Sequence, residues 1–178
     1  EQLGAAIADG NGEQASSLAL ALAGLGYSIA MFRDSDTVLA PVTVTALATA
    51  DIPVFEYGSG LNTEQAIFTV ASDELVQALL VYARAERGNA AVDDNLNIRM
   101  PDLDRELIRG DFGNWASLSQ LNDAQLREAV AEVAARKKWF KDQRIARGLA
   151  PLVARVAAAN AASPLATALA QVEAWLYA

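Results

Sequence analysis

The sequence contains neither cysteine nor histidine among its 178 residues. Without cysteine, disulfide bonds and thiolate metal sites are impossible, and the chain suits a reducing cytoplasm. Without histidine, it lacks the commonest general base, the Ser-His-Asp triad and every imidazole metal ligand. Any metal ion must therefore be held by oxygen atoms, which favours Mg²⁺, Mn²⁺ or Ca²⁺ over zinc or copper.

The sequence is also short of positive charge and of long apolar runs. Its 14 basic residues are outnumbered by 22 acidic ones, and the net charge is −8. This argues against a nucleic-acid-binding surface over the whole chain, but it leaves room for a local basic patch. No apolar run approaches the roughly 18 residues of a membrane span, and no basic segment followed by an apolar core starts the chain. We expect a soluble, cytoplasmic protein with no membrane partner.

The first third of the chain has the pattern of an α/β fold. We expect a first strand over 3–8 that begins with no lead-in, a Gly-rich turn over 9–12, and a helix that ends at Gly26. The turn lacks the full dinucleotide fingerprint and a Walker lysine, so we interpret it as structural. An apolar run then starts at Tyr27 and predicts a buried parallel strand. A helix over 42–50 and a short strand over 52–57 follow.

Two aspartates end the apolar run, with one serine between them. In α/β sheets, ligands bind beyond the carboxyl ends of the strands, which is where Asp34 and Asp36 would stand. Two carboxylates about 4 Å apart repel by roughly 4 kcal/mol at an effective dielectric near 20. Unless one of them takes up a proton, the pair calls for a cation.

A further acid follows the next strand. Asn62 or Thr63 caps a helix that carries Glu64 in its first turn, on the same rim as the aspartates if the sheet is parallel. The helix dipole alone also favours an acid at this position, so a ligand role and a purely structural role both remain open.

The second half of the chain is expected to be helical, apart from one segment. Ser72 caps a helix over 73–86, and 87–121 has the composition of a mostly irregular acidic insertion with one helical turn over 104–108. Asn122 and Gln125 suit a capping box at the start of a helical lobe over 122–178. Ser163 and Pro164 start the last helix of that lobe.

The helical lobe carries the one concentration of positive charge in the sequence. It comprises Lys137, Lys138, Lys141, Arg144 and Arg147. If the helix continues through this segment, Lys137, Lys141 and Arg144 share a face, while Trp139 and Phe140 anchor the segment in the core. A solvated basic face and a phosphate-binding strip are equally good interpretations from the residues alone.

Four segments, in order, resemble the Toprim nuclease region of ATP-dependent endonucleases of the OLD (overcoming lysogenization defect) family, which includes the nuclease of the Gabija anti-phage system. They are 9–12, 25–36 with its Phe-Arg-Asp-Ser-Asp, 62–68 with its Asn-Thr-Glu-Gln-Ala-Ile-Phe, and the Lys-Trp-Phe-Lys of 138–141. The resemblance covers most of the chain. It implies a mainly parallel Toprim-like sheet flanked by helices over 1–86, with the insertion and the helical lobe appended.

The resemblance also implies roles for particular residues. Asp34 and Asp36 match the metal-binding Asp-x-Asp pair, Glu64 becomes their acidic partner, and Lys141 resembles a lysine that stabilises charge on the phosphate. The implied cofactors are Mg²⁺ or Mn²⁺, with Ca²⁺ as a non-catalytic occupant, and ATP only through an upstream ATPase domain that this sequence lacks. DNA would bind along Lys137, Lys138, Arg144 and Arg147 in a salt-sensitive manner.

One element of the family pattern is missing. Toprim sites also use a glutamate after an earlier strand, and neither Glu1 nor Glu13 has that setting. We expect the missing glutamate, and the first strand of the Toprim sheet that precedes it, to lie upstream of this sequence.

The leading hypothesis is therefore a metal-dependent DNA endonuclease domain. A second hypothesis is a non-catalytic assembly module whose degraded Toprim site supports a homodimer or contacts with the ATPase. A third is a receiver-like domain phosphorylated on Asp34, although the lysine and threonine that such domains use are not evident.

Overall fold

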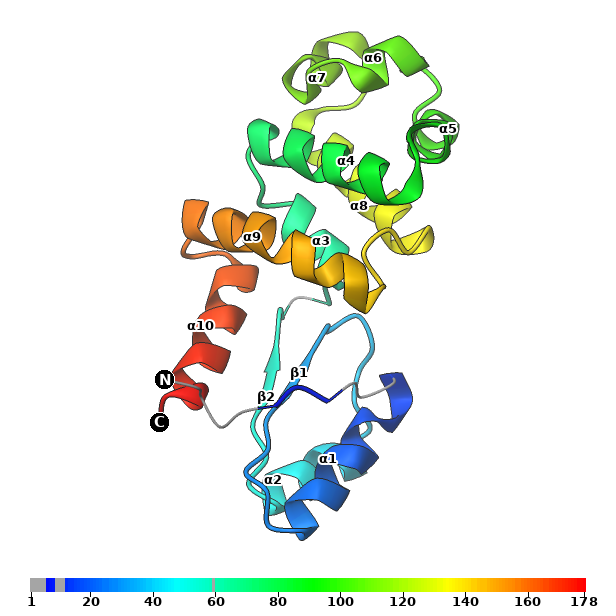
Figure 1. Ribbon diagram of the computed structural model, residues 1–178. Coiled ribbons are helices and arrows are strands. Elements are labelled where there is room, and N and C mark those ends of the chain that lie inside the picture. The colour runs from blue at the N-terminus through cyan, green and yellow to red at the C-terminus, as the bar shows by residue number, and fades with distance from the viewer. Residues whose placement is uncertain (1–5, 9–11, 59) are drawn as a thin grey trace. The chain divides into compact units, whose positions relative to one another are not determined.

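The computed structural model describes residues 6–8, 12–58 and 60–178, and these fold into two compact units. Unit 1 comprises 1–61 and 167–178, and unit 2 comprises 62–166. The positions of the units relative to one another are not determined, so each is described by itself (Figure 1).

Unit 1 is a small β-α-β arrangement with two additional helices. Its elements are a 3-10 turn at Gly12–Gln14, α1 at Ala15–Gly24, β1 at Met31–Arg33, α2 at Pro41–Thr49, β2 at Val54–Glu56, and most of α10 at Pro164–Leu176. Pro41 starts α2 because its fixed φ suits the first helical position and its missing N–H is not needed there. Gly26 ends the turn after α1 with φ at +89°, a conformation that glycine adopts without strain.

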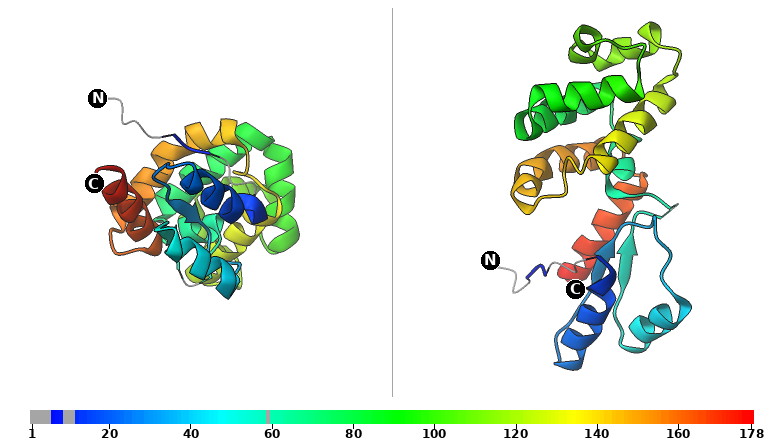
Figure 2. Two further views of the ribbon diagram at one scale, coloured as in Figure 1. Left: turned by 90° about the horizontal axis from the view of Figure 1, so that it is seen from below. Right: turned by 90° about the vertical axis from the view of Figure 1, so that its right-hand side faces the viewer.

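The strands of unit 1 pair in parallel, as the sequence predicted. Met31 pairs with Val54, Phe32 with Phe55, and Arg33 with Glu56. α1 and α2 lie side by side (Figures 1 and 2). Their side chains bury Met31 together with Ala19, Leu47 and Ile52. In the described part of the chain, the sheet has these two strands and no more.

Two strand predictions need correction. The strand expected from Tyr27 begins only at Met31, because Tyr27 lies 63 % exposed outside the core. Of the first strand expected over 3–8, residues 6–8 have no regular structure, and the remainder lies outside the described residues, as do 9–11 of the Gly-rich turn.

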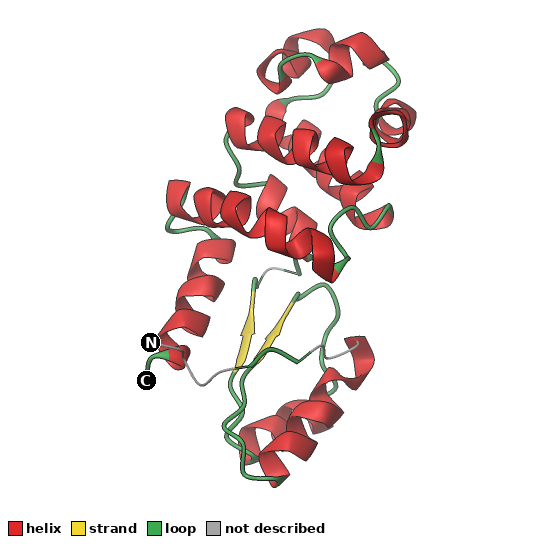
Figure 3. Cartoon of the chain, viewed as in Figure 1, coloured by secondary structure: helices red, strands yellow, loops and turns green. Residues whose placement is uncertain are grey.

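Unit 2 is entirely helical in its secondary structure (Figure 3). Its elements are α3 at Thr63–Phe68, α4 at Asp73–Arg87, α5 at Asn89–Arg99, α6 at Arg105–Arg109, a 3-10 turn at Phe112–Asn114, α7 at Trp115–Leu118, α8 at Asp123–Arg136, α9 at Gln143–Ala159 and the start of α10. α3 packs on α8, and α4 packs on α5 and α9. The largest buried side chains include Phe68, Trp115 and Trp139.

The expected irregular insertion over 87–121 is wrong, because α5, α6 and α7 occupy most of it. Six of its apolar residues are at most 2 % exposed: Val92, Leu96, Leu103, Ile108, Phe112 and Trp115. Asp93 is also buried, between the guanidinium groups of Arg84 and Arg109. Asp93 is therefore part of the buried core, although the composition of the segment counts it as a polar residue.

The helix starts behave as their sequences predicted. Asn62 and Asn122 each form a complete capping box with the glutamine three residues later, and Ser72 caps α4. The Ser163 hydroxyl accepts from the Ala166 N–H at the start of α10. Among the described residues, no single helix is long and apolar enough to cross a membrane, although α9 and α10 taken together as a bent pair reach that length and apolarity.

Candidate functional site

Asp34 and Asp36 lie in the loop that directly follows β1, where the sequence placed them. Asp34 is half-buried and Asp36 is exposed. Since β1 and β2 are parallel, the loops after both strands leave the same edge of the sheet. The two carboxylates therefore stand at the carboxyl-end rim, which is the usual place for ligands in α/β sheets.

Ser35 fixes this loop to the one that follows β2. Its backbone N–H donates to the Leu61 carbonyl at 2.9 Å, and its hydroxyl donates to the Gly58 carbonyl at 2.7 Å. The same hydroxyl accepts from the Leu61 N–H at 3.0 Å. The residue between the two aspartates thus ties the ends of both strands together.

No cation neutralises the aspartate pair within the part of the chain that the structure describes. Arg33, the nearest base in sequence, is directed instead toward Glu56, with a nitrogen-to-oxygen distance of 3.5 Å, and also donates to the Thr37 carbonyl. Among the described residues, neither aspartate forms a salt bridge. Asp36 Oδ1 accepts a long hydrogen bond of 3.4 Å from the Thr37 hydroxyl.

Glu64 belongs to unit 2, and its position relative to the aspartates of unit 1 is not determined. It lies in the first turn of α3, after the Asn62 cap, and only 1 % of it is exposed. A charged carboxylate at this depth needs stabilising contacts, because burial costs it the solvation of water. Over the described residues, no three acidic side chains gather closely enough to hold a metal ion.

The basic segment also lies in unit 2, and its expected geometry is wrong. α8 ends at Arg136, and Lys138 adopts φ at +54°, so the helix does not continue through Lys141. Arg87 fixes the turn by donating to the carbonyls of Lys138 and Trp139 at 2.7 and 3.0 Å. Lys137, Lys141 and Arg144 therefore do not share one helical face.

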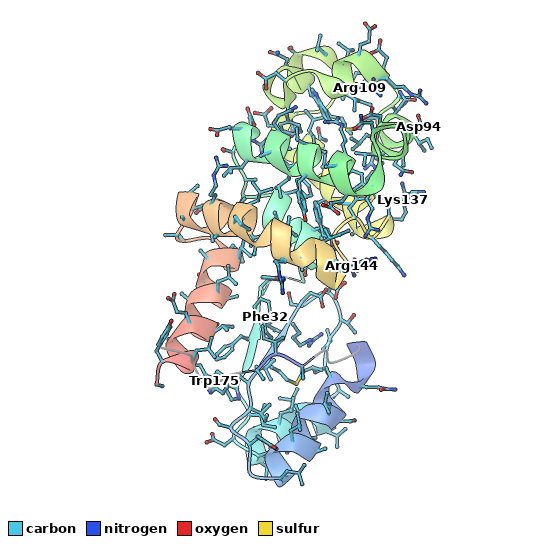
Figure 4. The ribbon with its side chains drawn as sticks, viewed as in Figure 1. Phe32, Asp94, Arg109, Lys137, Arg144 and Trp175 are labelled. Carbon is cyan, nitrogen blue, oxygen red and sulfur yellow. The ribbon has the colours of Figure 1, made fainter. Side chains whose placement is uncertain are left out.

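The anchoring role of the two aromatic residues is confirmed. Trp139 and Phe140 are 2 % and 7 % exposed, and the Phe140 ring is stacked with Phe68 and Tyr82. All five basic side chains are exposed: Lys137, Lys138, Lys141, Arg144 and Arg147. Figure 4 shows Lys137 at the end of α8 and Arg144 at the start of α9.

Arg144 is partly committed to its own helix. Asp142 caps α9 by accepting from the Arg144 N–H at 2.9 Å, and the Arg144 side chain donates to the same carboxylate at 3.0 and 3.3 Å. Hydrogen bonds from the side chain and then the backbone of Arg144 lower the pKa of Asp142 below its ordinary value. Less of the Arg144 charge is therefore available to a phosphate than its exposure suggests.

Comparison with known proteins adds no relative: no family model, no curated protein and no solved structure matches this chain.

Sequence reasoning missed two features of the rim. One is Ser35, whose partners lie 23 and 26 residues away. The other is the pair of Arg33 and Glu56, which are opposite each other in the parallel register. An alternation of charge at the ends of two predicted parallel strands could have suggested that pair, whereas nothing in the local sequence marks Ser35.

Proposed function

We propose that the chain is the nuclease part of an ATPase-nuclease and cleaves DNA phosphodiester bonds with a divalent metal. The supporting observation is the aspartate pair at the carboxyl-end rim, which has no basic partner in the described structure and lies in a loop tied at Ser35. The resemblance of the sequence to the Toprim nucleases points in the same direction.

The residues at the rim fit a hard divalent cation. Asp34 and Asp36 supply carboxylate oxygens, which Mg²⁺ and Mn²⁺ prefer, and the chain offers no sulfur or imidazole ligand from cysteine or histidine. When bound, such a cation supplies an activated water and stabilises charge on the phosphate oxygens. Asp34 and Asp36 would hold the ion, with Glu64 as the candidate third acid.

The other residues have electrostatic roles in the proposal. Lys141 is exposed and would place a fixed positive charge beside the phosphate as its negative charge grows. Lys137, Lys138 and Arg147 are exposed on the same stretch of chain and would contact phosphates of the DNA backbone. Such contacts weaken steeply as the salt concentration rises.

One observation favours a second function, which is non-catalytic. No three acids gather in the part of the chain that the structure describes, and two carboxylates alone are a sparse ligand set for an ion that takes six oxygen atoms or more. A non-catalytic assembly module, which supports a homodimer or an ATPase domain, would need no third acid.

Metal binding and plasmid nicking, measured on the same preparations, test the proposal. We expect Mn²⁺ to bind, by electron paramagnetic resonance, and to support nicking. Asp34→Asn and Asp36→Asn should abolish both. Asp51→Asn is the matched control, because Asp51 is an exposed acid of unit 1 whose φ of +54° asparagine also tolerates.

The kinetics of Lys141→Ala complete the test. This change should slow nicking with little effect on Mn²⁺ affinity, since in the proposal Lys141 acts on the phosphate and not on the ion. If both aspartate variants bind Mn²⁺ as tightly as Asp51→Asn and no variant nicks DNA, the nuclease proposal fails and the assembly module is favoured.

A further inference from the structure

Unit 1 contains a cavity of about 380 Å³ beside the ends of its strands. Small-molecule sites typically have volumes of roughly 300–1,000 Å³ and largely apolar walls. Here the apolar walls come from the loop before α2, from α2 itself, from the segment before β2 and from the first residue of β2: Leu39, Val44, Leu47, Ile52 and Val54. The volume and the lining are those of a ligand site.

The polar rim of this cavity has the guanidinium donors of Arg33 next to the carboxylate acceptor of Glu56. Arg33 and Glu56 are register partners at the ends of β1 and β2, and both line the cavity. The Arg33 side chain is only 15 % exposed, and its guanidinium has five N–H groups. One donates to the Thr37 carbonyl and another is directed toward Glu56, so further donors remain for a ligand.

We propose that this cavity binds a nucleobase, with a preference for guanine. A base has flat apolar faces that suit the aliphatic walls, and its edge carries adjacent donors and acceptors. The guanine carbonyl would accept from Arg33, while its ring N–H and amino group would donate to the two oxygens of Glu56. A charged organic acid fits less well, because Glu56 lies 3.5 Å from the guanidinium that would receive it.

The cavity shares a loop with the aspartate pair. Arg33, Ser35 and Thr37 line it, whereas Asp34 and Asp36, which alternate with them, do not. Binding of a base stands without any nuclease activity, while its use in placing DNA beside Asp34 and Asp36 rests on the proposed function.

Nuclear magnetic resonance of the full 178-residue chain with labelled Val, Leu and Ile methyl groups tests the proposal. We expect 2′-deoxyguanosine, added without metal, to shift the methyl signals of Val44, Leu47 and Ile52, and to leave those of Leu79 and Leu126 in unit 2 unchanged. 2′-Deoxyadenosine has one amino donor for Glu56 where 2′-deoxyguanosine has a ring N–H and an amino group. It should therefore bind about tenfold more weakly, because one hydrogen bond to the charged Glu56 is lost.

Two pairs of variants locate the site. Ala48→Trp fills the cavity from an exposed position on α2 and should abolish binding, whereas Val42→Trp, on the same helix but outside the lining, should not. Glu56→Gln replaces one of the two acceptor oxygens with an amide donor, so it should reduce the guanine preference by about tenfold. Arg33→Lys should weaken the binding of both nucleosides.

Several results would overturn the proposal. These are the absence of methyl shifts with either nucleoside, tighter binding of 2′-deoxyadenosine, and binding that persists in Ala48→Trp. Because the titration uses neither metal nor cleavage, a failed base site leaves the nuclease proposal standing, and a failed nuclease leaves the base site standing.

Discussion

Replacing Asp93 by alanine should strongly destabilise unit 2. Asp93 lies in α5 with no exposed surface, and its carboxylate accepts from Arg84 Nε at 2.9 Å and from Arg109 Nε at 2.6 Å. Arg84 also donates to the Ile108 carbonyl at 2.8 Å. The carboxylate therefore links α4 and α5 with the end of α6.

The size of the stability loss depends on which arginine partner of Asp93 stays buried in the variant. The Arg84 side chain is 10 % exposed, so in the variant its charge would remain in the interior with no acid beside it. Arg109 is 54 % exposed and can be solvated again, so it adds little. Removing one partner of a buried ion pair costs about 3–5 kcal/mol. At about 2–4 °C per kcal/mol for a chain of this length, Tm should fall by roughly 6–20 °C.

Urea unfolding followed by tryptophan fluorescence measures this loss, because Trp115 and Trp139 are both buried in unit 2. Asp94→Ala is the matched control: Asp94 is the next residue and pairs with Arg105, but both side chains are about half exposed. Figure 4 shows Asp94 and Arg109 at the surface around α5 and α6. The control should lose at most about 1 kcal/mol. A loss in Asp93→Ala no larger than in Asp94→Ala would refute the reasoning.

Two further predictions concern unit 2. Burial, and then the charge of Glu86, raise the pKa of Tyr82 above its ordinary value of 10.0, and its hydroxyl donates to the Ile145 carbonyl at 2.6 Å. The protonated Tyr82 should therefore stabilise the fold fully below about pH 10, and this stabilisation should be lost as the pH rises through the folded-state pKa. The urea midpoint of unfolding should fall over that range, and Tyr82→Phe should abolish this part of the fall. Residues 62–166 expressed alone should unfold cooperatively, since the buried side chains Phe68, Trp115 and Trp139 all lie within this continuous segment; a broad, non-cooperative transition in urea would contradict this.

The features predicted correctly are those that neighbouring residues determine. Asn122 and Gln125 form both hydrogen bonds of the expected capping box, at 3.0 Å each. Pro164 stands at the first position of α10, as expected. Such signals lie within four residues, so the sequence alone is sufficient to read them.

The errors arise where distant residues decide the local structure. The helix expected through Lys138 ends earlier because Arg87, 51 residues before it, binds the carbonyls of the turn. Composition likewise favoured an irregular segment around Asp93, because the two arginines that neutralise it stand 9 and 16 residues away. Hydrophobic periodicity does not register a buried acid, so the helical pattern of α5 appeared weaker than it is.

The candidate site shows the same division between local and distant causes. The place of Asp34 and Asp36 followed from an apolar run that ends in acids, and the structure puts them after β1. Ser35 was not assigned a role, yet its hydroxyl joins the loops after both strands. Arg33, Ser35 and Thr37 line the cavity, whereas Asp34 and Asp36 do not. The loop that Ser35 joins to the one after β2 thus carries the aspartates and also lines part of the cavity, so a base and a metal ion would be held by neighbouring residues of this one loop.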